Sequence, residues 1–147
     1  MGGSRPMRTR SSTDEAQKTI GYAFRRPRLL EQALTHKSHV NEIKGGRSQD
    51  YERLEFLGDA VLALLISEHL ADSFPGSSEG ELSKLKARLV SEPSLAGAAR
   101  RLDLGSLLRL GRGEELTRGR EKTSLLADAL EAIIAAIYLA GSSPPSR

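Results

Sequence analysis

The chain has 147 residues, 38% hydrophobic and 28% charged, which is enough to bury the core of one soluble domain. It contains no cysteine, which excludes disulfides and thiolate metal sites, so any metal must be held by oxygen or imidazole ligands. The net charge of +3 is a modest basic excess, and by itself it favours a nucleic-acid partner only weakly.

Nothing in the hydropathy pattern indicates a membrane protein. No apolar segment follows the basic N-terminus, so we find no secretory signal. The longest apolar stretch, residues 125 to 139, is too short for a membrane span and carries Asp128 and Glu131. We therefore expect a cytoplasmic protein with no membrane partner.

Three segments are predicted along the chain. Residues 1 to 12 contain arginines and no acidic residue and are predicted to form a disordered basic tail. A helical domain follows over residues 13 to 141, and residues 142 to 147 resemble a linker. Within the domain, helices are predicted over residues 13–20, 28–35, 50–73, 78–89, 91–103 and 124–140.

Cap residues support several of these boundaries. Ser78 and Glu81 have the spacing of a capping box, and Ser91 is a good N-cap for the helix that follows it. Residues 41 to 49 and 111 to 122 are predicted to be loops, and the second is rich in glycine and arginine. Its backbone and guanidinium groups could contact RNA, or it could be an ordinary mobile loop.

Two further groups of side chains allow more than one interpretation. His36 could be a metal ligand, but a hydrogen-bonded structural histidine is the better hypothesis. The three cations Lys84, Lys86 and Arg88 could contact phosphate groups, or they could simply lie on a helix face that is exposed to water.

The most informative stretch runs from Tyr51 to Leu62 and reads YERLEFLGDAVL. Glu52, Glu55 and Asp59 stand at i, i+3 and i+7, so on an α-helix their carboxylates fall within roughly 60° of one another. The opposite side is predicted to face the core and carries Leu54, Leu57, Val61 and Leu65.

Phe56, Ala63 and Ile66 share the acidic side, so this helix is apolar nearly all round. We therefore expect neighbouring helices to surround it. Ionised carboxylates on such a helix cost free energy unless they are paired or bind a metal. The last helix repeats the pattern, with Asp128 and Glu131 at i, i+3 in an otherwise apolar stretch.

If the acidic faces of the two helices meet, their four carboxylates converge and repel one another unless a divalent cation lies among them. Mg²⁺ prefers oxygen ligands and keeps several waters, which suits hydrolysis of a phosphodiester. Ion pairs with Arg53, Lys84 or Arg88 are the structural alternative for these acids.

The run ERLEFLGDAVL, from Glu52 to Leu62, closely resembles the signature of the ribonuclease III family. A second landmark reads SLLADALEA from Ser124 to Ala132, and weaker matches are ALTHKS and EGELS at residues 33–38 and 79–83. In order and spacing these landmarks cover about residues 20 to 140. The resemblance implies an all-α fold, a ribonuclease III endonuclease domain-like helical bundle with a long central signature helix.

The same resemblance implies roles for the acids. Glu55, Asp128 and Glu131 match Mg²⁺ ligands, with Mn²⁺ as a possible substitute, and Asp59 and Glu131 match the catalytic residues that position the attacking water. Two further family acids that line the cleft in a supporting role match Glu52 and Glu79.

Phe56 lies beside the carboxylates rather than on the core side, and the matching family residue docks into a pocket on a twofold-related partner. We therefore expect a homodimer with an active centre at each end of a valley that accepts double-stranded RNA. Each centre would cut one strand and leave 5′-phosphate and 3′-hydroxyl ends with short 3′ overhangs. The alternative places Phe56 inside a monomeric core.

The chain also departs from the family pattern. Tyr51 stands where bacterial members usually have asparagine, and Ala135-Ala136 replaces a common glycine pair. The family usually continues with another helix and a double-stranded-RNA-binding domain, whereas this sequence ends at Arg147. Without that domain we expect weak, strongly salt-dependent RNA binding, and without that helix some exposed apolar surface.

The predicted function is a Mg²⁺-dependent endoribonuclease that cleaves double-stranded RNA in ribosomal or messenger RNA processing. A non-catalytic duplex-RNA-binding scaffold of the same fold is the first alternative, although such relatives tend to lose the acids that are present here. An all-α nucleotide pyrophosphohydrolase, which also clusters acids around Mg²⁺, is the second.

Overall fold

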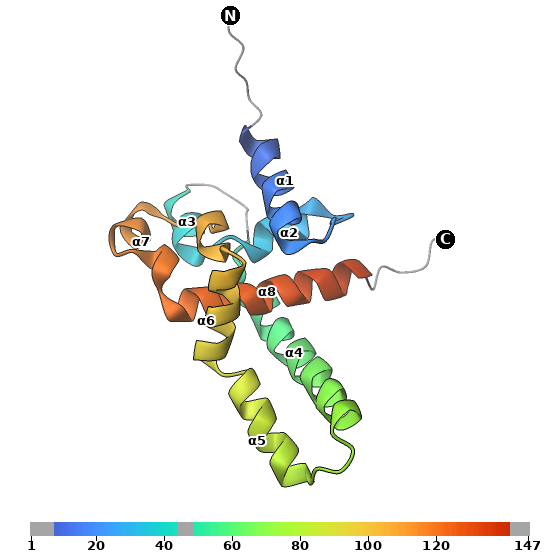
Figure 1. Cartoon of the computed structure of the whole chain (residues 1–147). Coiled ribbons are helices and arrows are strands. Elements are labelled where there is room, and N and C mark those ends of the chain that lie inside the picture. The colour runs from blue at the N-terminus through green and yellow to red at the C-terminus, as the bar shows by residue number, and fades with distance from the viewer. Residues whose placement is uncertain (1–7, 44–48, 142–147) are drawn as a thin grey trace, which may run out of the picture.

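Helices alone form the regular structure of the residues that the computed structural model describes, which are 8–43 and 49–141 (Figure 1). Extended pairing in these ranges is limited to one parallel bridge between Thr35 and Arg109. This confirms the all-α prediction. In chain order the elements are α1 (Arg8–Ile20), α2 (Pro27–Ala33), α3 (Lys37–Glu42), α4 (Glu52–Ser73), α5 (Glu79–Leu89), α6 (Glu92–Arg101), η1 (Leu104–Leu107), α7 (Arg112–Leu116), η2 (Gly119–Glu121) and α8 (Thr123–Gly141).

Helix α8 lies at the centre of the fold and packs most extensively against α4 and α6, and also against α2 (Figure 1). Its 19 residues are long and apolar enough to cross a membrane by length and composition, so the expectation that this stretch is too short was wrong. The packing provides another reason for this composition, because residues such as Leu126, Ala129 and Ile133 are buried between the neighbouring helices.

The two longest helices, α4 and α8, approach each other very closely at one point. A Cβ atom placed on Gly58 would lie only 1.8 Å from the backbone oxygen of Glu131, so no other residue fits there without moving a helix. Gly58 lies between Glu55 and Asp59 in sequence, and the crossing therefore brings the acidic stretch of α4 directly against α8.

The second half of α4 is less covered than predicted. Leu64 is 66% and Leu65 is 50% exposed, although Leu65 was assigned to the core side and the whole helix was expected to be wrapped. The reason is visible in Figure 1, where α4 and α5 form a hairpin that projects beyond the other helices. An apolar face remains uncovered along this hairpin, as expected for a surface that packs against another molecule.

The sequence analysis did not predict the two short α-helices α3 and α7. Helix α3 ends inside the predicted loop 41–49, and α7 lies inside the predicted loop 111–122. Helix α7 occupies part of the segment 111–122, and Glu42 at the end of α3 accepts hydrogen bonds at its N-terminus from Arg112 N (2.9 Å) and Gly113 N (3.4 Å). Residues 44 to 48 of the other predicted loop lie outside the described residues. Helix α1 begins at Arg8, so residues 8 to 12 are helical and not part of a disordered tail.

The boundaries that depend on local caps were predicted correctly. Ser78 and Glu81 form the reciprocal capping box of α5, and Ser91 caps α6 by accepting a hydrogen bond from Ser94 N. Gly21 follows α1 with a φ of +78°, a conformation that favours glycine.

The crossing at Gly58 provides a test of the packing. Gly58→Ala is expected to destabilise the fold by roughly 2–3 kcal/mol or more, because the new methyl group meets a backbone atom that cannot rotate away. The matched control is Gly97→Ala in α6, where the added Cβ would meet only the end of the Arg101 side chain at 3.8 Å. The control should be neutral or stabilising by up to about 1 kcal/mol through helix propensity. Urea unfolding measures both, and equal stabilities for the two variants would contradict the close crossing.

Candidate metal centre and active site

A cluster of carboxylates lies where α4 crosses α8. Glu55, in the first turn of α4, and Asp128 and Glu131 of α8 each offer a carboxylate oxygen, and these oxygens lie within 4.8 Å of one another. The expected convergence of acids from two helices is therefore observed. Oxygen atoms at this spacing and of this type suit a divalent cation such as Mg²⁺ or Mn²⁺.

The electrostatics of the cluster favour such a cation. Burial raises the pKa of Glu131, which is only 8% exposed, to about 8, and the neighbouring Asp59 carboxyl adds to the effect. Burial together with the nearby Asp128 raises the pKa of Glu55 to about 7. Burial also raises the pKa of Asp128. Without a cation the cluster therefore retains protons near neutral pH, and a bound cation would replace them.

Asp59 lies at the edge of this cluster. It is one turn beyond Glu55 on α4, its side chain is exposed, and it interacts directly with the Glu131 carboxyl. An exposed carboxylate beside partly buried ones is placed to contact a molecule that approaches from solvent. The structure thus brings together Glu55, Asp59, Asp128 and Glu131, while their individual roles stay predictions.

The two supporting acids are placed differently. Glu52 is exposed, lies one turn before Glu55 and forms a surface ion pair with Lys37 (3.5 Å). Glu79 lies in the first turn of α5, accepts a hydrogen bond from the Ser83 hydroxyl (3.0 Å), and follows the end of α4 that is farther from the cluster. From Glu55 to that end α4 rises roughly 27 Å, so Glu79 does not reach the cluster within one chain. Its supporting role stays a prediction.

The structural alternative for the central acids, pairing with nearby cations, has no support in the described residues. Ion pairs there join Lys37 to Glu52, Arg120 to Glu115, and Lys122 to Glu114. None of these includes a carboxylate of the cluster, so mutual repulsion among the acids is not relieved by arginine or lysine in the described part of the chain.

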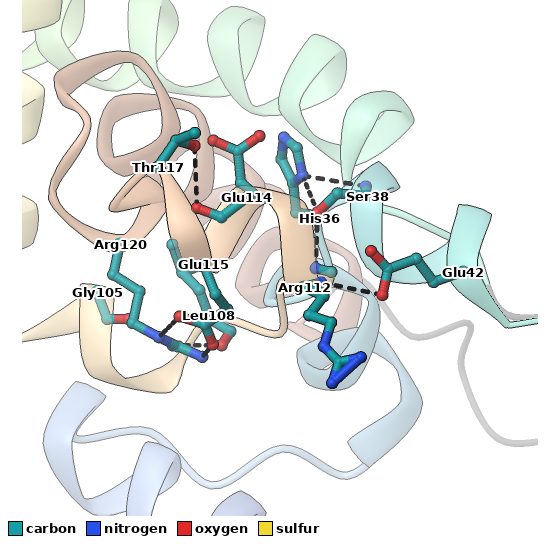
Figure 2. Close-up of polar contacts among 11 residues, drawn as sticks. His36, Ser38, Glu42, Gly105, Leu108, Arg112, Glu114, Glu115, Thr117 and Arg120 are labelled. Carbon is teal, nitrogen blue, oxygen red and sulfur yellow. Dashed lines mark hydrogen bonds and ion pairs between the residues drawn. The ribbon is translucent and has the colours of Figure 1, made fainter.

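His36 has the structural role that the sequence favoured. It is the N-cap of α3, where its Nδ1 accepts a hydrogen bond from Ser38 N (3.1 Å) and lies 2.8 Å from Ser38 Oγ (Figure 2). Ser38 Oγ in turn accepts a hydrogen bond from Gly111 N (2.8 Å), which ties α3 to the start of α7. Burial lowers the pKa of His36, in keeping with a neutral ring whose Nδ1 acts as an acceptor.

The glycine- and arginine-rich segment is more ordered internally than a mobile loop. Arg120 donates hydrogen bonds to the carbonyl oxygens of Gly105 (2.9 Å) and Leu108 (2.6 Å) and pairs with Glu115 (Figure 2). Lys122 likewise pairs with Glu114. Arg120 and Lys122 therefore serve the fold, while contact between RNA and the other guanidinium groups of this segment stays a prediction.

Phe56 is 83% exposed, so the alternative that buries it in a monomeric core is wrong. It borders an open groove of about 600 Å³ whose apolar wall comes from three helices: Leu29 of α2, Leu54 and Leu57 of α4, and Leu139 of α8. A large exposed aromatic beside an apolar groove is typical of a protein interface. Sequence reasoning found Phe56 but not this groove, because its wall is assembled from residues far apart in the chain.

The fold and the site together define a class: an all-helical domain whose crossing helices present a carboxylate cluster suited to a divalent metal, as in metal-dependent hydrolases. Residues 26–144 match the sequence model of the family described as Ribonuclease-III-like. The chain therefore belongs to the ribonuclease III family, which confirms the resemblance seen in the sequence.

Individual relatives agree with this assignment. The chain is 58% identical over 120 residues to Ribonuclease 3 of Desulforamulus reducens, which covers 82% of this chain and 49% of the relative. It is 53% identical over 130 residues to Ribonuclease 3 of Geobacillus thermodenitrificans, with 88% and 53% covered. The chain thus spans about half the length of the curated relatives it matches.

Solved structures show the same similarity at the level of the fold. Two structures of the nuclease domain of ribonuclease III from Campylobacter jejuni superpose with TM-scores of 0.78 and 0.77 at 46% sequence identity. They cover 86% of this chain and 85% and 82% of their own chains. One of them is described as flexible in a region involved in dimer formation.

The raised pKa values predict how stability changes with pH in the metal-free protein. Groups that bind protons more tightly when folded stabilise the fold fully below about pH 4.5, and this contribution is lost as the pH rises through about 7 for Glu55 and about 8 for Glu131. With a chelator, the melting temperature should therefore fall from pH 6.5 to 8.5, by about 3 °C or more. His36, whose pKa is lowered, acts with the opposite sign and below this window.

Glu131→Gln is the matched control, because it removes the titrating group from the cluster and should reduce the pH dependence. Saturating Mg²⁺ should raise the melting temperature of the parent protein more at pH 8.5 than at pH 6.5. If the melting temperatures of the parent and the variant change equally between pH 6.5 and 8.5, the assignment of the raised pKa values is contradicted.

Proposed function

We propose that the protein is a divalent-metal-dependent endoribonuclease that cleaves double-stranded RNA. The observation that carries the proposal is the carboxylate cluster of Glu55, Asp128 and Glu131, within 4.8 Å of one another, in a chain of the ribonuclease III family. We propose a cytoplasmic role in the processing of ribosomal or messenger RNA.

Glu55, Asp128 and Glu131 would hold Mg²⁺, or Mn²⁺ in its place. The three crowded carboxylates have raised pKa values because they are partly buried and repel one another, and a divalent cation would relieve this repulsion. When bound, the ion makes a water molecule more acidic and stabilises the charge that develops on the phosphodiester.

The remaining steps fall to the side chains of the chain itself. Asp59, exposed at the edge of the cluster, accepts a proton from the attacking water. Glu131, in contact with Asp59, orients that water while its own carboxylate stays buried. The new bond between the water oxygen and phosphorus replaces the bond to the 3′ oxygen, which leaves and takes up a proton from solvent, so the products are a 5′-phosphate and a 3′-hydroxyl. Two offset cuts on opposite strands leave short 3′ overhangs.

We propose that the functional unit is a homodimer in which Phe56 of each copy enters the groove beside Phe56 of the other. The exposed ring and the groove of about 600 Å³ support an interface on this side. A twofold arrangement would place two carboxylate clusters along one valley, which suits the shape and the phosphates of an A-form duplex.

Cleavage of a long RNA duplex tests the activity. In Mg²⁺ the parent protein should produce short duplexes, and a chelator should abolish the reaction. Asp59→Asn should lower kcat by roughly 100-fold or more, because it removes the proton acceptor and keeps the shape. Asp72→Asn, at an exposed position near the other end of α4, is the matched control and should retain full activity.

Metal-independent cleavage, or an Asp59→Asn variant as active as the parent, would contradict the proposed mechanism. Binding of the duplex without cleavage under any divalent metal would favour the non-catalytic scaffold instead. Cleavage of free nucleoside triphosphates rather than duplex RNA would favour a pyrophosphohydrolase.

Analytical ultracentrifugation tests the dimer independently. Phe56→Ala should raise the dimer dissociation constant by about 30-fold or more, since loss of a buried aromatic anchor costs roughly 2 kcal/mol or more. Leu116→Ala is the control, because Leu116 is equally exposed, at 82%, but lies on α7. An unchanged dimer in the Phe56→Ala variant would place the interface elsewhere.

A further inference from the structure

Arg26 connects two walls of the groove beside Phe56. It precedes α2 as its N-cap residue, and its backbone carbonyl oxygen accepts a hydrogen bond from Leu29 N (3.0 Å). Its guanidinium Nη2 donates to the carbonyl oxygen of Leu139 in the last turn of α8 (3.2 Å). Leu29 and Leu139 both line the groove. One residue thus holds a wall residue of α2 through its backbone and a wall residue of α8 through its side chain.

The contact with Arg26 satisfies an unpaired backbone group of α8. The last four carbonyl groups of an α-helix have no N–H partner within the helix, and Leu139 carries one of these four, since α8 ends at Gly141. A guanidinium group satisfies such a carbonyl and also lies favourably at the negative end of the helix dipole. The hydrogen bond joins residues 113 positions apart in the chain, so it fixes the last turn of α8 relative to the start of α2.

The segment before Arg26 is itself held by the core. Phe24 is 6% exposed and belongs to the main hydrophobic core, and its N–H donates to Gln17 Oε1 of α1 (2.7 Å). Tyr22 packs edge-on against the Phe24 ring, with centroids 4.9 Å apart, and its N–H donates to the Gln17 carbonyl oxygen (3.2 Å). The exposed Arg26 side chain therefore links α8 to a segment whose backbone is already fixed.

The groove depends on such a link because part of its wall is built from helix ends. Leu29 lies in the first turn of α2 and Leu139 in the last turn of α8, and both side chains are only partly buried. Helix ends fray more readily than helix centres. An interface loses affinity when side chains must be ordered on association, so a wall residue that is held before association lowers this entropic cost.

We propose that Arg26 is a positioning residue of the dimer interface, whose guanidinium group holds Leu139 in the groove wall so that the groove is preformed for Phe56 of a second copy. The proposal rests on the proposed function, since it takes the second copy as the occupant of the groove. Arg25 and Arg28 are also exposed, but they form no hydrogen bond or ion pair within the described part of the chain, so this role is specific to Arg26.

Arg26→Met tests this role, because methionine keeps the aliphatic part of the side chain and removes the donor. Analytical ultracentrifugation should show a dimer dissociation constant about fivefold higher, as expected for the loss of one hydrogen bond. Arg25→Met is the matched control, since it removes the same charge from the neighbouring exposed residue, and it should dimerise like the parent. Arg26→Lys, whose ammonium group can donate to the same carbonyl oxygen, should recover most of the affinity.

Two further measurements separate positioning from a general loss of stability. In a Phe56→Ala background, where the dimer is weakened, Arg26→Met should lower the melting temperature by less than about 2 °C, because Arg26 is exposed. In a Leu139→Ala background, Arg26→Met should change the dimer dissociation constant by less than about twofold, because the side chain that it positions is gone.

The outcomes distinguish the role of Arg26 from the interface itself. If Phe56→Ala weakens the dimer while Arg26→Met leaves it unchanged, or while Arg25→Met weakens it as much as Arg26→Met does, the positioning role is overturned and the proposed interface stands. If Phe56→Ala leaves the dimer unchanged, the proposed interface is wrong and the role of Arg26 is overturned with it.

Discussion

The close approach of α4 and α8 at Gly58 is the constraint on which the rest of the structure depends. Backbone meets backbone there, with no room for a Cβ atom, and the acids that flank this point on α4 are pressed against those of α8. A wider crossing would leave the same residues on the same helices but spread their carboxylates beyond the reach of one cation. The site is therefore a consequence of helix packing rather than of loop geometry.

This crossing also determines the energetics. The helices that carry the acids are largely apolar, so the carboxylates are drawn partly out of water together and raise one another's pKa. In the proposed function this free energy is recovered by binding of a divalent cation, which would couple metal binding to the stability of the fold. Asp59 and Phe56 remain exposed on the same helix, so one element carries a proposed metal ligand, a proposed catalytic group and a proposed interface residue.

The features that could be predicted from the sequence are those that depend on the spacing of nearby residues in the chain. The capping box of Ser78 and Glu81, the long helix over the signature run, and the pairing of Asp128 with Glu131 on one face all follow from periods and caps. The convergence of the acids could be predicted because carboxylates on two apolar helices cost free energy unless they are paired or share a bound cation. Gly58 gave no such signal, since its importance comes from a helix far away in sequence.

The features that were missed depend on long-range contacts. Helix α7 looks like a loop because its N-terminus is capped by Glu42 of α3 rather than by a residue of its own. Leu65 was assigned to the core side because a helix apolar on every side does not reveal which side is covered. Tyr51 was noted only as a departure from the family pattern, and its burial against the His36 ring became visible only in three dimensions.

Anomalous X-ray scattering from a crystal grown with Mn²⁺ would test the central claim most directly, since it locates the ion without reference to activity. The account predicts one strong peak at the crossing of α4 and α8, at about 2.0–2.4 Å from oxygens of Glu55, Asp128 and Glu131. Well-ordered crystals with Mn²⁺ bound elsewhere, or with these three side chains pointing away from one another and no peak between them, would contradict it.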